Sequence, residues 1–306
     1  VGEAPIAIPL DRASPSCTIA TADVLFQGPV LRASGMGYSG TGREDVFVRS
    51  VPLLCLVSVV CAHASGAENF AGHVVSYTAG IGADPTYADP AAALGSPTRF
   101  TGVQFGFAGA VTPFNPPFDP GDIVSIGRGG SLVVSFDQAI TNDASHRFGI
   151  DLLVFGNAFF IDNSYPSGIV GGTFGRIGDI AVSSDGQNWT NVTAAAMGPL
   201  FPTLGYSDLS SPYAGAPGSV LTDFTRAVDP GFDPMGHTFA EIVAAYDGSG
   251  GGQGIDIGAL GLTSISYIRV SNSGAPVSID AFSGVPAPAT LFSLVIPVLG
   301  TRRRRA

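Results

Sequence analysis

Ser131-Leu-Val-Val-Ser-Phe136 and Leu152-Leu-Val-Phe155 are two short, almost continuously apolar runs near the middle of the chain. The turn sequence Gly127-Arg-Gly-Gly130 immediately precedes the first of them. Apolar runs of this length are typical of buried strands, whereas a buried helix needs a longer pattern. The two runs therefore predict strands in the core of a β-sandwich.

Strand-like runs of similar length recur on both sides of this pair, separated by turn residues. The domain that contains them is predicted to extend from residue 68 to 284, a size that suits one β-sandwich. We therefore expect a single antiparallel β-sandwich in an all-β domain. The predicted strands cover residues 73–78, 123–126, 131–136, 150–155, 180–184, 189–192, 264–270 and 277–282.

One or two short helices are expected beside the strands. Asp89 can cap Pro90-Ala-Ala-Ala-Leu94, with proline at the first helical position. Thr238-Phe-Ala-Glu241 is a capping box, so Glu241 has a structural explanation before any catalytic one. The glycine-rich stretch 248–254 follows no predicted strand and opens no helix, so we expect a flexible loop there.

Charge is sparse and mostly acidic. Only 12% of the 306 residues are charged, and between residues 51 and 301 six arginines stand against 19 acidic residues, a net charge of about −13. This charge disfavours nucleic acid as a partner, because nucleic acid binding needs a basic surface. Divalent cations and neutral or basic ligands are compatible with it, and solubility is the simpler explanation of the acidic surface.

The N-terminal part of the chain has the pattern of a secretory signal peptide. Arg49 precedes the apolar run 51–61, which is too short to span a bilayer. Ala62-His-Ala64 follows with small residues at the positions that signal peptidase reads, and Ala67 offers a second cleavage position. We expect residues 51–64 to be the apolar core and cleavage site, although a buried strand is the competing interpretation.

Residues 1–50 do not belong to the predicted domain. We interpret them as an over-extended N-terminus together with the basic start of the signal, with Met36 as a possible true start. All three cysteines, Cys17, Cys55 and Cys61, precede the predicted cleavage site. The mature protein is therefore expected to contain no disulfide, so its core or a bound metal must stabilise it.

The C-terminal segment 285–306 has three parts in a fixed order. A proline-containing motif, Val285-Pro-Ala-Pro-Ala289, is followed by a short apolar stretch and then by a terminal run of four arginines. The apolar stretch can enter a membrane while the arginines hold its end in the cytoplasm. It is shorter than a complete span and contains Pro297, so it suits a transient anchor.

This order resembles the PEP-CTERM sorting signal, which exosortase-type transpeptidases of biofilm-forming Gram-negative bacteria process. The family usually has glutamate between the two prolines, where this chain has Ala287. The resemblance implies an exported protein at the cell surface or in the extracellular matrix, similar to PEP-CTERM proteins of planctomycete-type bacteria. An ordinary uncleaved anchor is the alternative. The implied sorting residues are Val285, Pro286, Pro288, Ala289, Arg302, Arg303, Arg304 and Arg305.

Several stretches of the domain resemble the discoidin and galactose-binding-like jelly-roll class. They are the Ala-Leu-Gly region of 88–97, the Ser-Ser-Asp-Gly turn before Trp189, and the paired final runs 265–270 and 278–282. The resemblance implies a jelly-roll fold, and it implies calcium between the early loop and the last strand, at Asp84, Asp89 and Asp280. The sequence pattern requires no cofactor, and calcium is the one that the resemblance implies.

One predicted loop combines aromatic rings with polar side chains, as sugar-binding sites do. It follows the buried run 150–155, and the alternative is that Phe159 and Phe160 close the end of the core. The candidate ligand residues of this loop are Asn157, Phe159, Phe160, Asp162 and Tyr165.

Three functions are compatible with these patterns. The first is a non-catalytic adhesion or glycan-binding module that binds extracellular polysaccharide, and the second is a structural surface protein without a specific ligand. The third, a secreted polysaccharide hydrolase or lyase, has no catalytic signature in the sequence to support it. We therefore predict no enzyme activity, and name signal peptidase and the exosortase as partners during export.

Overall fold

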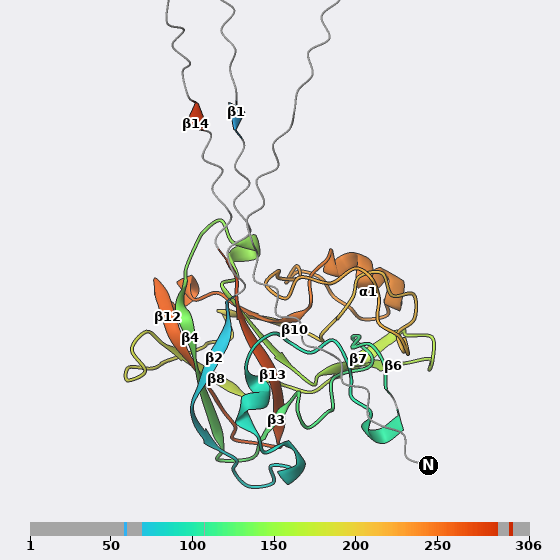
Figure 1. Ribbon diagram of the computed structural model, residues 1–306, viewed down its shortest axis with the longest axis horizontal. Coiled ribbons are helices and arrows are strands. Elements are labelled where there is room, and N and C mark those ends of the chain that lie inside the picture. The colour runs from blue at the N-terminus through green and yellow to red at the C-terminus, as the bar shows by residue number, and fades with distance from the viewer. Residues whose placement is uncertain (1–57, 60–68, 107, 287–293, 296–306) are drawn as a thin grey trace, which may run out of the picture. The chain divides into compact units, whose positions relative to one another are not determined.

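A computed structural model describes residues 58–59, 69–106, 108–286 and 294–295. The predicted sorting residues Pro288, Ala289 and Arg302 to Arg305 lie outside these ranges, and so does the expected cleavage site at residues 62–64. The described part is mainly antiparallel β-structure with one short α-helix, which confirms the predicted all-β class (Figure 1). None of its helices is long and apolar enough to cross a membrane.

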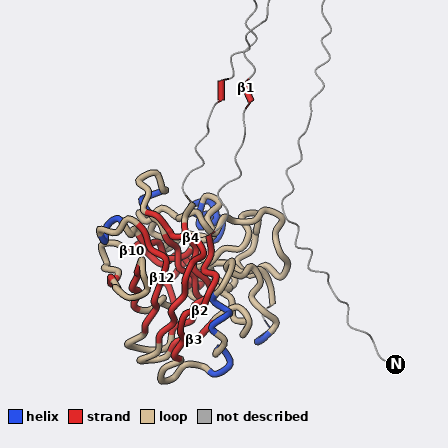
Figure 2. Tube along the Cα trace, turned by 60° about the vertical axis from the view of Figure 1, so that its left-hand side comes forward, coloured by secondary structure: helices blue, strands red, loops and turns tan. Residues whose placement is uncertain are grey.

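Ten strands form one antiparallel sheet, which Figure 2 shows in red. Every predicted run overlaps one of its strands, whereas β10 and β11 are not predicted by the sequence pattern. The sheet order is β10 (Met197–Phe201), β11 (Gly252–Ile255), β5 (Leu152–Gly156), β13 (Val277–Gly284), β2 (Asn69–Thr78), β4 (Ser131–Thr141), β12 (Ser264–Ser271), β8 (Asp179–Ser183) and β9 (Thr190–Asn191), with β3 (Val124–Ile126) also paired with β13.

The sheet is strongly curled into a half-barrel, and its two halves meet at β13 and β2. Only the pairs Ser283–Phe70 and Gly284–Asn69 join these strands. The register shifts within β2 and within β13, and such irregularities bend strands. The curl brings apolar side chains of both halves into one core. They include Leu132, Val134, Ile180 and Ile268 from one half and Leu152, Val154, Ile255 and Ile279 from the other.

A second apolar cluster lies outside this core and carries the rest of the fold. It joins the helix α1 (Phe239–Tyr246) to the hairpin of β6 (Phe159–Asp162) and β7 (Val170–Phe174), which lie near each other in Figure 1. Its buried residues are Phe114, Phe160, Val170, Phe201, Leu204, Val228, Phe239, Ile242 and Tyr246. This cluster fixes the position of the hairpin that carries most of the predicted ligand residues.

Helix α1 begins where the capping box predicts. The Thr238 hydroxyl accepts from the N–H of Glu241, and the Glu241 carboxylate accepts from the N–H of Thr238 at 2.8 Å, so the capping box is confirmed. Asp247 ends the helix in a left-handed conformation. The second predicted helix is a single turn of 3-10 helix, η2 (Pro90–Ala93), capped by Asp89 as expected.

The remaining elements are short. Single 3-10 turns are η1 (Pro85–Tyr87), η3 (Gln104–Gly106), η4 (Arg147–Gly149) and η5 (Gly258–Leu260). A two-residue strand β1 (Ser58–Val59) pairs with β14 (Leu294–Val295).

The prediction of a flexible loop at 248–254 is wrong. Ser249 is fully buried, the glycines at 250–252 are buried too, and β11 starts at Gly252. A Cβ at residue 250 would lie 2.1 Å from a ring carbon of Phe224, and one at Gly251 would lie 2.4 Å from the carbonyl oxygen of Pro202. The glycines therefore allow close packing here, and they do not indicate mobility.

Candidate functional site

The hairpin of β6 and β7 separates the aromatic residues of the predicted ligand loop onto two faces. Successive side chains of a strand point to opposite faces, so Phe160 enters the second cluster while Phe159 and Ile161 face outward. Phe174 lies opposite Phe159 in the ladder, and the two ring centroids are 5.0 Å apart. Phe160 thus fills the second cluster, as the alternative interpretation held, whereas Phe159 is half-buried and pairs with the exposed ring of Phe174.

Four aromatic side chains meet beside this hairpin in a pocket of about 420 Å³, here called the aromatic pocket. Phe159 and Tyr165 come from the predicted loop, whereas Phe114 and Tyr213 come from segments far away in the sequence. Glycine, alanine, asparagine and proline residues complete the wall, at Gly106, Ala108, Asn115 and Pro116.

The rings of the aromatic pocket support one another by edge-to-face contacts. The Tyr165 and Tyr213 centroids are 5.0 Å apart, and those of Phe114 and Tyr213 are 6.4 Å apart. Phe114 also contacts Phe160 at 5.9 Å, which connects the pocket to the second cluster. Such contacts fix the orientation of aromatic faces, although Tyr165 itself is 70% exposed.

Asp162 orders the loop that carries Tyr165. Its carboxylate accepts from the N–H groups of Ser164, Gly168 and Ile169 at 2.9, 2.9 and 3.1 Å, and from the Tyr213 hydroxyl at 3.1 Å. Burial raises the pKa of Asp162, but these hydrogen bonds outweigh burial, so its pKa lies below the ordinary value. Asp162 is therefore a positioning residue at neutral pH.

Tyr213 is held as a neutral hydrogen-bond donor. Burial raises its pKa well above the ordinary value, and the negative charge of Asp162 raises it further. The hydroxyl consequently keeps its proton and fixes the ring between the loop and Phe114.

A second pocket of about 290 Å³ is lined by Phe174, the ring partner of Phe159, and we call it the arginine pocket. Its wall contains Asn157, Phe174 and Arg176, and continues along residues 275–278 near the start of β13. Arg176 donates from Nη2 to the side-chain oxygen of Asn272 at 3.2 Å and to the carbonyl oxygen of Ala275. These bonds hold the guanidinium at the pocket wall.

The predicted ligand residues thus have three different positions. Phe159 and Tyr165 line the aromatic pocket, Asn157 lines the arginine pocket, and Phe160 and Asp162 are supporting residues. Phe114, Tyr213 and Arg176 are absent from the sequence prediction. Only the tertiary fold brings Phe114 and Tyr213 to the hairpin, whereas Arg176 follows β7 by two residues and no local pattern marks it as a ligand residue.

The three aspartates suggested for calcium have separate local partners. Asp84 accepts from the N–H of Thr86, and Asp89 accepts from the N–H of Ala91, both at 2.9 Å. Asp280 is buried in β13 and accepts from the N–H of Thr98 at 3.3 Å on each carboxylate oxygen. Within the described ranges, no three His, Cys, Asp or Glu side chains are grouped so that they could hold a metal ion.

Asp280 is nevertheless chemically unusual. Burial raises its pKa well above the ordinary value, the Thr98 hydrogen bond lowers it, and the negative charge of Asp122 raises it. Burial also raises the pKa of Asp122, and the charge of Asp119 adds to that effect. A carboxyl group in this position is therefore easier to bury when it is protonated.

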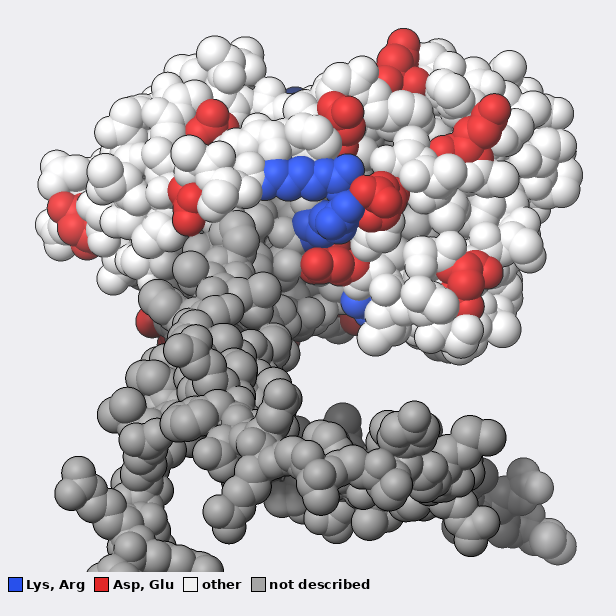
Figure 3. All heavy atoms as spheres, turned by 90° about the horizontal axis from the view of Figure 1, so that it is seen from above, with Lys and Arg blue, Asp and Glu red and all other residues white. Residues whose placement is uncertain are grey.

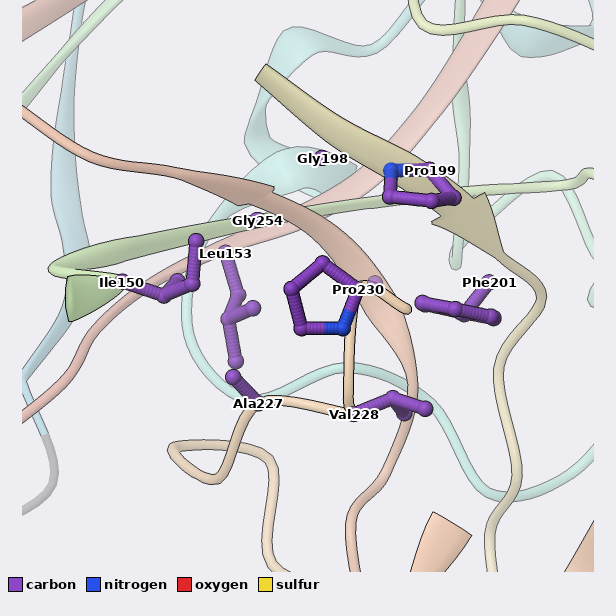
Figure 4. Close-up of a pocket in the computed structure, with 10 residues that line it drawn as sticks. Ile150, Leu153, Gly198, Pro199, Phe201, Ala227, Val228, Pro230 and Gly254 are labelled. Carbon is purple, nitrogen blue, oxygen red and sulfur yellow. The ribbon is translucent and has the colours of Figure 1, made fainter. Parts of the chain in front are cut away.

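The small cavity in Figure 4 is a packing defect that is partly open to solvent, because its wall includes the exposed residues Pro199 and Pro230. Side chains of Ile150, Leu153, Ala227, Val228 and Phe201 surround it, and its volume of about 10 Å³ is at the lower limit for one water molecule. It is therefore too small for a sugar ring.

Acidic side chains are scattered over the face in Figure 3, and basic side chains gather at one place between them. Among the ion pairs of the described residues, Arg147 and Arg226 both contact the carboxylate of Asp247 at the end of α1. The single carboxylate of Asp247 offsets one of these two positive charges, so the three side chains together keep one net positive charge.

Comparison with known proteins leaves the function to be inferred from this geometry. No protein-family model matches the sequence, and a search of curated proteins finds no significant match.

Proposed function

We propose that this chain is an exported, non-catalytic glycan-binding module of the bacterial cell surface or extracellular matrix. The aromatic pocket is the observation that carries the proposal. Its rings are oriented by mutual contacts and by Asp162, and Tyr165 leaves much of its face exposed. Sugars bind such faces through their C–H groups, and an ordered aromatic side chain loses little entropy on binding.

We propose in addition that the β-domain of this chain is a jelly roll of the discoidin or galactose-binding-like class. The curled antiparallel sheet supports this proposal, and so do the turn Pro90–Ala93 capped by Asp89 and the Asp185 turn before Trp189, because both turns lie in stretches that resemble that class. A solved structure of this protein, superposed on members of the class, tests this part of the proposal through the order and connection of the strands.

The proposed location depends on the two terminal signals. Signal peptidase would act after residue 64, and an exosortase-type transpeptidase would act at the motif that begins at Val285 and Pro286. Val285 still belongs to the folded part, because its N–H donates to the carbonyl oxygen of Asp151 at 2.8 Å. A motif that follows the last core strand directly would keep the domain close to the membrane until cleavage.

Replacing Tyr165 with alanine is expected to weaken binding of a polysaccharide at least tenfold. Exposed aromatic anchors are typical binding hot spots, and tenfold corresponds to about 1.4 kcal/mol. Isothermal titration of the purified protein with oligosaccharides from the producing organism's matrix would measure the loss. The Phe159→Ala variant should show a loss of similar size, because its ring lines the same pocket.

The matched control is Phe148→Ala, which removes an exposed aromatic ring that lines neither pocket. Its affinity should equal that of the wild type. If no matrix oligosaccharide binds, the chain is better described as a structural surface protein. Release of reducing ends from the same oligosaccharides would instead support a hydrolase or lyase.

Replacing Arg302 to Arg305 with serine is expected to abolish C-terminal processing. The charges that retain the end of the apolar stretch in the cytoplasm would be lost. Mass analysis of the C-terminus after cell fractionation would detect the unprocessed chain. Lysine at the same four positions keeps the charge and should preserve maturation, whereas normal maturation of the serine variant would contradict the sorting signal.

A further inference from the structure

We infer that the arginine pocket binds the carboxylate of an acidic sugar, so that the ligand is a uronic-acid-containing polysaccharide. This inference rests on the proposed glycan-binding function and adds the chemical class of the ligand. In the proposed arrangement, one sugar contacts the aromatic pocket while a nearby acidic sugar of the same polymer chain contacts Arg176.

Arg176 is held in place by the surrounding chain. Its Nη2 donates to Asn272 and to the carbonyl oxygen of Ala275. A Cβ at residue 274 would lie 2.6 Å from Nη2, so Gly274 provides the room that the guanidinium occupies. An arginine carries five N–H donors in a planar fork. Both of these bonds start from Nη2, so the N–H groups of Nη1 and Nε can donate to a ligand.

The two pockets are close enough for one polymer to reach both. Phe159 lines the aromatic pocket, Phe174 lines the arginine pocket, and their ring centroids are 5.0 Å apart across the ladder of β6 and β7. Directly opposed residues of two paired strands lie on the same face of a sheet. The aromatic pair therefore connects the walls of the two pockets.

Charge selects the ligand class at this site. Arg176 is the charged residue among those that line the arginine pocket, and Asn157 adds an amide that can donate and accept hydrogen bonds. The chain is otherwise strongly acidic, so an anionic polymer would be repelled from most of its surface. A carboxylate matches the planar guanidinium, and such charge-assisted bonds are stronger than those between neutral groups.

The test compares galacturonic acid oligosaccharides with neutral galactose oligosaccharides of the same length, titrated into the full-length protein. We expect tighter binding of the acidic series, and Arg176→Gln should weaken that binding about tenfold while binding of the neutral series changes less than twofold. Arg176→Lys keeps the charge and should retain part of the preference. Salt should reduce the preference in the wild type, because it screens exposed charges.

The charge control is Arg269→Gln, which removes an arginine that packs over Trp189 and lines neither pocket. It should leave the affinities for both oligosaccharide series unchanged, whereas Tyr165→Ala should weaken the binding of both series. Binding of neither series would overturn the proposed function itself. Equal binding of both series by the wild type, unaltered in Arg176→Gln, would retain glycan binding and overturn the acidic-sugar assignment.

Discussion

Replacing Tyr246 with alanine is expected to lower the free energy of unfolding by about 3 to 5 kcal/mol. Tyr246 is fully buried at the end of α1, where its ring contacts Phe201 at 5.9 Å between centroids. Its hydroxyl donates to the carbonyl oxygen of Pro202 at 2.9 Å. The substitution would leave a large cavity in the second cluster and an unpaired buried carbonyl, at the place where the helix supports the hairpin.

The Tyr246→Phe variant separates these two contributions. It keeps the ring and removes only the hydroxyl, so the expected loss is about 0.5 to 1.5 kcal/mol. Urea denaturation followed by circular dichroism would measure both variants. A loss below about 1 kcal/mol for Tyr246→Ala would show that the second cluster contributes little to the cooperative unit.

Replacing Asp280 with asparagine is expected to stabilise the protein at pH 7 in the presence of chelator, by about 1 to 3 kcal/mol. The carboxyl group of Asp280 is 2% exposed and faces the negative charge of Asp122, so ionisation is unfavourable there. Asparagine has nearly the same shape and no charge, and its side-chain oxygen can accept from the N–H of Thr98. Each kcal/mol raises Tm by about 2 to 4 °C in a domain of this size.

The effect should depend on pH in a defined direction. The pKa of Asp280 is higher in the folded protein than in the unfolded chain, so the folded state binds its proton more tightly. The contribution of Asp280 to the free energy of unfolding is therefore most favourable below about pH 3.9, the pKa of aspartate in the unfolded chain. This contribution is lost as the pH rises from there toward the pKa of Asp280 in the folded protein. The advantage of Asp280→Asn should consequently vanish below about pH 4.

The same variant tests the calcium site implied by the family resemblance. An ion bound there would compensate the buried charge, so an intact calcium site would raise Tm of the wild type by about 5 °C, and chelator would remove the shift. Asp280→Asn should weaken that shift. Identical melting curves with calcium and with chelator would contradict a calcium site at Asp84, Asp89 and Asp280. An Asp280→Asn variant that is less stable than the wild type in chelator would contradict the claim that the buried charge of Asp280 destabilises the fold.

Local sequence determined the elements whose signals lie within a few residues. Apolar runs bounded by turns predicted β4 and β5, and the capping box at Thr238 and Glu241 predicted the start of α1. The turn before Trp189 is another case, since Asp185 accepts from the N–H groups of Gln187 and Asn188 at 2.8 Å. These features form through neighbouring residues, so short stretches of sequence are sufficient to predict them.

The tertiary structure decided the features that depend on distant residues. The stretch at 248–254 is rich in glycine because Phe224 and Pro202 approach its backbone, and a local pattern cannot distinguish this packing from flexibility. The fold also separates Phe159 from Phe160, and it brings Phe114 and Tyr213 to the loop of Tyr165. The sequence by itself determined most strands of the large sheet, the start of the capped helix and an aromatic loop, whereas the pocket exists only because the curled sheet and its outer cluster bring remote side chains together.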